Sequence, residues 1–301
     1  MPLPHLVRFD WAMKRLLRHK SNFVVLEGFL SSLFEEKITI CKILESEGNK
    51  EDITDKFNRV DLLAENSKGE LIIIEVQNNR ELDYFLRMLY GVSKAVTEYI
   101  SEGDMYEKIR KVYSVNIVYF DLGQGTDYVY HGRTEFRGIH NHDVLKLSKQ
   151  QSERFICQAA GDLFPEYYVL RVNEFDQKAV TPLDEWIVFL KTGEIGNDTQ
   201  APGLAEARER LKFSSLDKQD RAAYLRNIEN LRVQRGVIDT ARIEGLEEGR
   251  AQGREEGKVE GKEEGKAESR LEIARNMKSL GIATKLIISA TGLTAGEIEN
   301  L

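Results

Sequence analysis

A β-hairpin pattern between residues 59 and 79, with the sequence RVDLLAENSKGELIIIEVQNN, constrains the fold of this chain more than any other feature. Two apolar runs flank a short polar segment, as the strands of a hairpin flank their turn. A three-residue turn from Ser67 to Gly69 would place glycine at the left-handed position that such turns need. In that register Asp61 lies directly opposite Glu75. A two-residue turn would place Asp61 opposite Val76 instead.

The same register divides the hairpin residues between two faces. Residues that lie opposite each other, and residues two apart on one strand, point to the same side of a sheet. Gln77 therefore shares a face with Asp61 and Glu75, and this polar face is a candidate site. The other face is expected to pack into the core through Val60, Leu62, Ile74 and Val76.

The surrounding sequence predicts an α/β domain with a mixed sheet over residues 1–195. The predicted order is a helix from Asp10, a second helix capped by Ser21, a strand at 38–44, the hairpin, a helix at 83–103, strands at 112–122, 128–136 and 167–172, and a helix at 182–191. Apolar stripes on the first three helices are expected to face the core: Phe9, Met13, Leu16 and Leu17; Val24, Val25, Phe29, Leu33 and Phe34; Phe85, Met88, Leu89, Val92, Val96 and Tyr99.

Three segments are predicted after residue 195: a linker with charged helices at 196–240, a helical arm at 241–268 and a small helix-turn-helix-like tail at 269–301. In the arm a glycine recurs at every fourth position from Gly245 to Gly265, usually followed by Lys or Arg. Such an arm either pairs with another copy of the chain, as a homo-oligomer, or serves as a low-complexity spacer.

The tail carries the start and stop signals of a small helical unit. Gly281 and Gly292 indicate helix ends, and Thr294 with Glu297 has the pattern of a capping box. The few basic residues of the tail favour assembly or partner binding over DNA reading. A shared apolar core is expected from Ala274, Met277, Leu280, Leu286, Ile287, Leu293 and Ile298.

The charge balance excludes a protein coated in basic residues to hold nucleic acid. The formal net charge is −7 and the pI is near 5.5, although the first twenty residues are locally basic. The chain has no signal-peptide pattern and no apolar run of membrane-spanning length, which predicts a cytoplasmic protein without a membrane partner. Cys41 and Cys157 lie far apart with no CxxC motif, so neither a zinc site nor a disulfide framework is indicated.

Two carboxylates on one face of a hairpin suit a hard divalent cation. Asp61 and Glu75 would repel each other unless a cation lay between them. Mg²⁺ takes a few carboxylates and completes its shell with water and phosphate oxygens, and Mn²⁺ can substitute for it. Gln77 is not a strong base, but its amide can orient a metal-bound water. The alternative is an incidental acidic pair on a polar hairpin face.

Several blocks within residues 1–125 carry a family likeness: FDWAMKRLL, VLEGFLSSL, VDLLAENSKGELIIIEVQ, RMLYGVSKAV and EGDMYEKIRKVYSVNIV. With the glycine-repeat arm and the ending TGLTAGEIENL, they resemble the PD-(D/E)XK nuclease superfamily and, within it, the Rpn family of recombination-promoting nucleases and transposases. The resemblance implies a restriction-endonuclease-like αβββαβ core followed by an α-helical C-terminal region. It also implies a metal-dependent DNA endonuclease linked to recombination or mobile elements.

The resemblance assigns roles to particular residues. Asp61 and Glu75 become metal ligands, and Gln77 stands where the superfamily usually has lysine. Glu27 on the first core helix is the candidate for a third acidic ligand, with an ordinary helix glutamate as the alternative. Asp10 is a weaker candidate, because an N-cap role already accounts for it.

Arg87 and Lys94 lie two turns apart on the helix after the hairpin. They either contact DNA phosphate and supply positive charge near the scissile group, or are solvated helix charges. The absence of the usual lysine leaves open a catalytically inactive, nuclease-like protein that binds DNA or assembles. A regulatory protein that binds DNA through its C-terminal helices is a third possibility.

Overall fold

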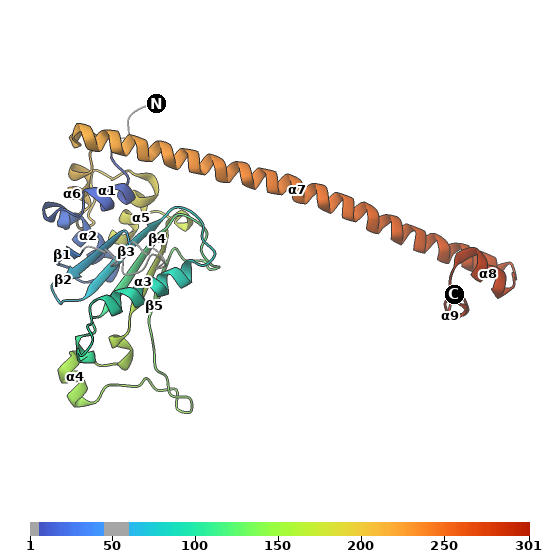
Figure 1. The fold of residues 1–301 in the computed structure, drawn as a ribbon, viewed down its shortest axis with the longest axis horizontal. Helices are drawn as coiled ribbons and strands as arrows, with labels where there is room; N and C mark the ends of the chain where they lie inside the picture. Colours follow the sequence, from blue (N-terminus) through green and yellow to red (C-terminus); the bar gives the residue numbers. More distant parts are fainter. Residues whose placement is uncertain (1–5, 45–59) are drawn as a thin grey trace. The chain divides into compact units, whose positions relative to one another are not determined.

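The computed structural model describes residues 6–44 and 60–301 of the chain. The chain divides into two compact units, Met1–Leu225 and Arg226–Leu301. Helix α7 (Lys218–Ser279) begins in the first unit and continues through the second (Figure 1). None of the helices described is both long enough and apolar enough to cross a membrane.

The first unit is an α/β fold, and from α2 to β4 it follows the predicted αβββαβ order. Its elements are α1 (Phe9–Arg15), α2 (Phe23–Phe34), β1 (Ile40–Leu44), β2 (Leu62–Asn66), β3 (Leu71–Gln77), α3 (Tyr84–Glu98), β4 (Val112–Val118), β5 (Val129–Gly132), α4 (Lys149–Phe155), β6 (Glu166–Arg171), α5 (Pro182–Thr192) and α6 (Leu204–Arg210). The predicted helical C-terminal region is also confirmed, as α7, α8 (Thr284–Thr291) and α9 (Ala295–Glu299).

The strands form one mixed sheet in the order β1-β2-β3-β4-β6-β5, which confirms the predicted sheet type. β1, β2 and β3 are antiparallel neighbours, β3, β4 and β6 are parallel, and β5 joins β6 antiparallel at the edge. β3 is buried along nearly its whole length. Burial on both faces explains why this strand has a continuous apolar run instead of a strict alternation.

Helices cover both faces of the sheet (Figure 1). On one face, Val92 of α3 packs in a cluster with Leu63 and Ile73, which are partners in the β2–β3 register. On the other face, the ring of Phe34 at the end of α2 lies 5.0 Å from the ring of Tyr113 in β4. Glu75 lies two residues from Ile73 on β3 and therefore points to the same face of the sheet, the face that α3 covers.

The hairpin core is as expected except at Val60. Leu62, Ile74 and Val76 are buried, as predicted. Val60 instead belongs to the cluster of Leu63 on the α3 side. β2 begins only at Leu62, so the two-residue alternation of a strand does not extend back to Val60.

The buried stripe of α3 is rotated from the predicted one. Phe85 and Leu89, expected in the core, are each 54% exposed, whereas Tyr84 and Met88 are buried. Tyr84 takes the inward position because its hydroxyl donates to Asn116 Oδ1 of β4 (3.2 Å). Apolarity alone could not distinguish these neighbouring positions, since one residue turns a helix by about 100°.

The start of α2 also differs from the predicted one. A 3₁₀ turn at Lys20–Asn22 precedes it, and Asn22, not Ser21, stands before its first residue. The Asn22 side chain does not cap the helix but donates to the Leu16 carbonyl (2.9 Å). Of the side chains expected to face inward, Val25, Phe29 and Leu33 are buried, and Val24 and Phe34 are half-buried.

The first unit extends beyond residue 195, where a linker was expected. Trp186 of α5 donates its indole N–H to the Pro202 carbonyl (3.1 Å), and α6 packs against α2. Apolar residues between 201 and 216 are buried in this unit: Ala201, Leu204, Ala207, Leu211, Phe213 and Leu216. The Gly, Asn and Pro residues around position 197 mark a turn in the chain and not the end of the folded unit.

The second unit contains the predicted helical tail. Gly281 and Gly292 have φ of 73° and 72°, and Thr294 with Glu297 forms the predicted capping box. Ala274, Ile287 and Ile298 form its core, with Met277 and Leu293 packed against them. The expectation for Leu280 and Leu286 is wrong: they are 78% and 62% exposed, because this small core has room for one face of each short helix.

The packing of residues 201–203 on α2 can be tested at Gly28. A Cβ atom at Gly28 would lie 2.3 Å from the Pro202 carbonyl oxygen and 2.5 Å from Gly203 Cα, so the backbone would have to shift. We expect Gly28→Ala to lower the free energy of unfolding by about 1–3 kcal/mol, measured by urea denaturation. Gly236→Ala is the control, because a Cβ there meets no atom within 4 Å. It should raise the stability of α7 by about 0.5–1 kcal/mol, and a similar gain in Gly28→Ala would contradict the packing.

Candidate active site

The β2–β3 hairpin has the register predicted from its sequence. Leu62 pairs with Ile74 and Ala64 with Ile72. Gly69 has φ of 77°, and its N–H donates to the Asn66 carbonyl (3.0 Å). The predicted turn from Ser67 to Gly69 is therefore confirmed, and the two-residue turn is excluded.

Asp61 and Glu75 lie one position beyond the last paired residues of this register, Leu62 and Ile74. Asp61 directly precedes β2, and its Oδ2 accepts a hydrogen bond from the Val76 N–H (2.8 Å). Its backbone carbonyl accepts a bond from the Arg18 guanidinium (2.7 Å). Asp61 is thus tied to the C-terminal end of β3 by its side chain and to the chain after α1 by its backbone.

Glu75 is a buried carboxylate, 7% exposed, next to a cation. Arg87 Nη2 of α3 lies 3.3 Å from Glu75 Oε2, and Arg87 Nη1 lies 2.9 Å from Glu81 Oε1. Burial alone would lower the pKa of Arg87, but the charges of Glu75 and Glu81 outweigh burial and raise it. Arg87 is therefore a fixed positive charge between two carboxylates.

Gln77 is the last residue of β3, and Glu81, which pairs with Arg87, also holds its side chain. Its Nε2 donates to Glu81 Oε1 (2.5 Å), so Glu81 joins the amide of Gln77 to the guanidinium of Arg87. Glu81 lies in the connection between β3 and α3 and was missed in the sequence. The sequence does contain an acid four residues after Gln77 and six before Arg87. This spacing brings the three side chains together only because the chain turns between β3 and α3.

A buried polar group lies on β4 beside Glu75. Asn116, the register partner of Glu75, accepts a bond from the Tyr84 hydroxyl and donates to Ser114 Oγ (2.9 Å). Burial, followed by the nearby Glu75 charge, raises the pKa of Tyr84, so its hydroxyl stays protonated at neutral pH. These residues were also missed, because single polar residues in an apolar strand give no pattern.

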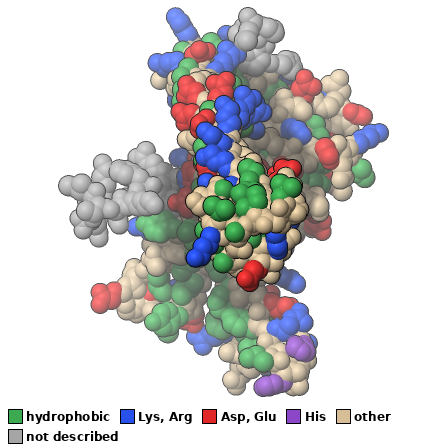
Figure 2. All heavy atoms as spheres, turned by 90° about the vertical axis from the view of Figure 1, so that its right-hand side faces the viewer, with side chains coloured by type: hydrophobic (Ala, Val, Ile, Leu, Met, Phe, Trp, Pro, Cys, Tyr) green, Lys and Arg blue, Asp and Glu red, His purple; other side chains and the backbone are tan. Residues whose placement is uncertain are grey.

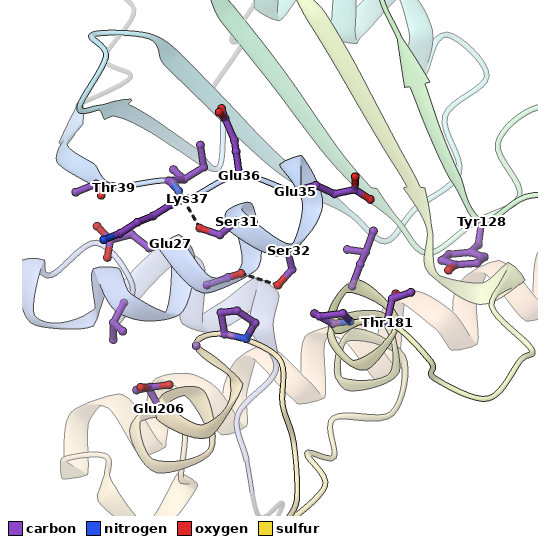
Figure 3. A pocket seen from close by; sticks show the side chains of 17 residues that line it. Glu27, Ser31, Ser32, Glu35, Glu36, Lys37, Thr39, Tyr128, Thr181 and Glu206 are labelled. Atoms are coloured by element: carbon purple, nitrogen blue, oxygen red, sulfur yellow. Dashed lines mark hydrogen bonds between the residues drawn. The ribbon is translucent and has the colours of Figure 1, made fainter.

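Glu27 does not join this group. Its Oε1 accepts a hydrogen bond from the Ile40 N–H at the start of β1 (2.8 Å). It lines a pocket of about 980 Å³ with residues of α2, α5 and α6, among them Ser31, Thr181 and Glu206 (Figure 3). Its observed contact is structural, since it satisfies a backbone donor where β1 begins.

Asp10 has a different role from the predicted N-cap. Arg8 precedes α1, and Asp10 lies inside its first turn. Asp10 Oδ1 accepts from the Trp11 N–H and from Arg8 Nε, and Oδ2 accepts from the Asn78 amide (3.2 Å). Asp10 therefore anchors the chain immediately after Gln77.

The two basic residues of α3 are separated by the fold. Arg87 reaches Glu75, as described above. Lys94 lies about 10 Å further along the helix and acts on Glu98, where it opposes the rise in pKa that burial causes.

The donors on the hairpin face suit a hard divalent cation. Asp61, just before β2, and Glu75 and Gln77 of β3 carry oxygen atoms of the kind that such a cation binds. Across the residues that the structure describes, no cluster of three or more His, Cys, Asp and Glu side chains could hold a metal. A cation here would take its remaining ligands from water and substrate, as Mg²⁺ commonly does.

Comparison with known families finds a match over most of the chain. A model of the PD-(D/E)XK nuclease family transposases matches residues 7–241. No curated protein and no solved structure matches the chain. The match covers the hairpin, α3 and the rest of the sheet, so the candidate site lies within it.

The ion pairs of Arg87 should stabilise the fold measurably. We expect Arg87→Ala to lower the free energy of unfolding in urea by about 1–3 kcal/mol, because it leaves the buried Glu75 without this cation. The side chain is 34% exposed, so the full cost of breaking a buried pair is not expected. Arg80→Ala, at an exposed arginine before the same helix, should change stability by no more than about 0.5 kcal/mol. Equal effects of the two substitutions would contradict a role for Arg87 in holding Glu75.

Proposed function

Since the chain belongs to the PD-(D/E)XK nuclease family transposases, we propose that it is a metal-dependent endonuclease that hydrolyses DNA phosphodiester bonds. The observation that supports the proposal is the hairpin register, which ends at Leu62 and Ile74. Continued by one residue, it would bring Asp61 and Glu75 together with Gln77 on one face. Two acids close together on one face favour a cation between them, and in the structure Arg87 pairs with one of the two, Glu75.

Asp61 and Glu75 are proposed as ligands of Mg²⁺, with Mn²⁺ as a substitute. A bound divalent ion supplies charge neutralisation at the phosphate and lowers the pKa of a coordinated water. The contribution of the chain is rigidity: Asp61 is fixed by the Val76 N–H, and Glu75 lies in a buried central strand. Both carboxylates are thus held in place before substrate arrives.

Arg87 is proposed to contact the scissile phosphate. Its Nη2 and Nη1 pair with Glu75 and Glu81, and its Nε is buried without a hydrogen-bond partner among the described residues. Arg87 would therefore have to release a carboxylate to bind phosphate. A planar guanidinium binds phosphate oxygens through two parallel bonds and stabilises charge that develops there. For Lys94, two turns away, a weaker contact with the DNA backbone is proposed.

Gln77 is proposed to orient the attacking water through its amide. Lysine at this position would also bring a positive charge, and Arg87 can provide that charge from α3. Glu81, which accepts from both Gln77 and Arg87, holds the two groups in one arrangement. Glu27 is retained only as a proposed ligand that would have to leave its bond to Ile40.

The substrate class is DNA, and the proposed setting is recombination or mobile-element activity in the cytoplasm. The α7 arm is proposed to join copies of the protein. Self-association through this arm is compatible with both a catalytic and a non-catalytic protein, so it does not distinguish between them.

A second candidate is a nuclease-like protein that binds DNA or assembles without cutting. The observation that favours it is the engagement of the site by the protein's own groups: Glu81 holds the Gln77 amide, and Arg87 pairs with Glu75. The proposed cation would have to compete with Arg87 for Glu75.

The endonuclease proposal predicts that purified protein nicks supercoiled plasmid in Mg²⁺ or Mn²⁺ and stops when EDTA is added. Asp61→Asn and Glu75→Gln should each reduce nicking by on the order of 10²-fold or more, because each removes a charged ligand without changing side-chain shape. Glu102→Gln, at an exposed acid, is the control and should retain full activity. Nicking at the normal rate by both hairpin variants would rule out this site.

Exchange of Gln77 separates the two candidates. If Gln77 works in place of lysine, Gln77→Ala should slow nicking by about 10-fold or more and Gln77→Lys should retain it. If the nuclease activity has been lost with the lysine, wild-type protein should not nick plasmid, and Gln77→Lys should nick it. Asn79→Lys adds the same charge at an exposed position two residues away and should reproduce neither change.

A further inference from the structure

The arm of α7 presents an ordered pattern of charges on an unpartnered surface. Every residue from 241 to 270 is exposed, and a Cβ atom at any glycine from Gly245 to Gly265 would meet nothing within 4 Å. Basic and acidic residues are interleaved along α7, and blue and red side chains lie next to one another in the view from its C-terminal end (Figure 2). Glycines cost a helix about 1 kcal/mol each relative to alanine, so a solvated spacer alone gives no reason to keep one in every turn.

Two charged rows flank the glycines. Each residue turns an α-helix by about 100°, so the residues just after and just before each glycine lie on opposite sides of the glycine track. The row after the glycines is basic: Arg250, Arg254, Lys258, Lys262 and Lys266. The row before them is acidic apart from Gln252: Glu244, Glu248, Glu256, Glu260 and Glu264.

An apolar face leads into this track. Ile238 and Leu246, on the N-terminal side of the repeat, are 49% and 56% exposed. Gly249 lies three turns beyond Ile238, and Gly253 lies two turns beyond Leu246, so these residues share one side of the helix. Exposed aliphatic side chains that continue a close-approach surface are characteristic of a helix that packs on another helix.

We propose that the occupant of this face is the α7 arm of a second copy of the chain, paired in parallel. The inference rests on the self-association proposed above and specifies its geometry. In a parallel pair, the twofold axis runs along the helices, and the basic row of each copy lies beside the acidic row of the other. In an antiparallel pair, the axis crosses the helices, and basic lies beside basic and acidic beside acidic. Charge complementarity therefore selects the parallel pair.

The four-residue repeat also sets the handedness of the pair. Because four exceeds 3.6, the glycine track winds around the helix in a right-handed sense. Two helices that follow such a track cross right-handed at about −40°, the geometry in which glycines allow backbones to approach closely. The six glycines serve this crossing, which a side chain would hold apart.

Two basic side chains of these rows form ion pairs within their own helix, which compete with pairing between copies. Lys258 lies 4.0 Å from Glu255, and Lys266 lies 2.9 Å from Glu263, each three residues earlier. All four side chains are at least half exposed, and such surface pairs contribute little. Pairing between copies gains from several contacts formed together, so it can replace these two bonds.

The first test measures the mass of the full chain by light scattering after size-exclusion chromatography. Wild-type protein should be a dimer. Reversal of the basic row to Glu, or of the acidic row to Lys, should weaken association by on the order of 10²-fold, and an equal mixture of the two variants should restore it. Reversal of Glu247, Glu255 and Glu263 to Lys, on the far side of the helix, is the control and should leave the dimer intact. A single-chain mass for wild-type protein, or row reversals without effect, would overturn the proposal.

The second test establishes direction by disulfide cross-linking in full chains that carry Cys41→Ser and Cys157→Ser. Gly249→Cys and Gly261→Cys, tested one at a time, should each form a disulfide between copies in a parallel pair. In an antiparallel pair at most one of the two positions can meet its own counterpart, and that result would refute the proposed direction. Ala251→Cys, on the far face, should not cross-link. Both tests measure mass and covalent linkage, so a protein that fails to nick DNA would disprove the endonuclease and not this pairing.

Discussion

The register of the β2–β3 hairpin is the constraint on which the candidate site depends. Gly69 adopts the left-handed conformation of a three-residue turn, and every pair up to Leu62 and Ile74 follows from it. A shift of one residue would turn Glu75 to the other face and Ile74 to the α3 side. The buried apolar side chains on both faces oppose that shift, because it would bury a carboxylate among them.

Arg87 joins this rigid hairpin to helix α3. Its ion pairs with Glu75 and Glu81 bring strand, loop and helix together, and Glu81 extends the contact to Gln77. The same guanidinium that stabilises the folded site would have to share Glu75 with a divalent cation. In the proposed endonuclease, the stability of the folded site and the binding of a cation would therefore compete for Glu75.

The sequence was a good guide where local chemistry decides the structure and a poor one where neighbours in space decide it. The turn at Gly69 and the capping box at Thr294 were predictable, since each depends on a few adjacent residues. The α3 stripe was predicted with Phe85 instead of Tyr84, because the bond of Tyr84 to Asn116 joins residues distant in the chain. Glu27 was chosen as an acid on the right helix, yet its observed partner is a backbone N–H of β1.

The sequence by itself determined the αβββαβ order of the core and the register of the hairpin. These properties follow from hydrophobic period and turn geometry, which act over a few residues. Only the tertiary structure decided that Arg87 lies beside Glu75, that Glu81 holds Gln77, and that Asp10 anchors Asn78. Those contacts join a strand to a loop and to two helices, and their formation depends on how the helices pack on the sheet, which no short sequence pattern encodes.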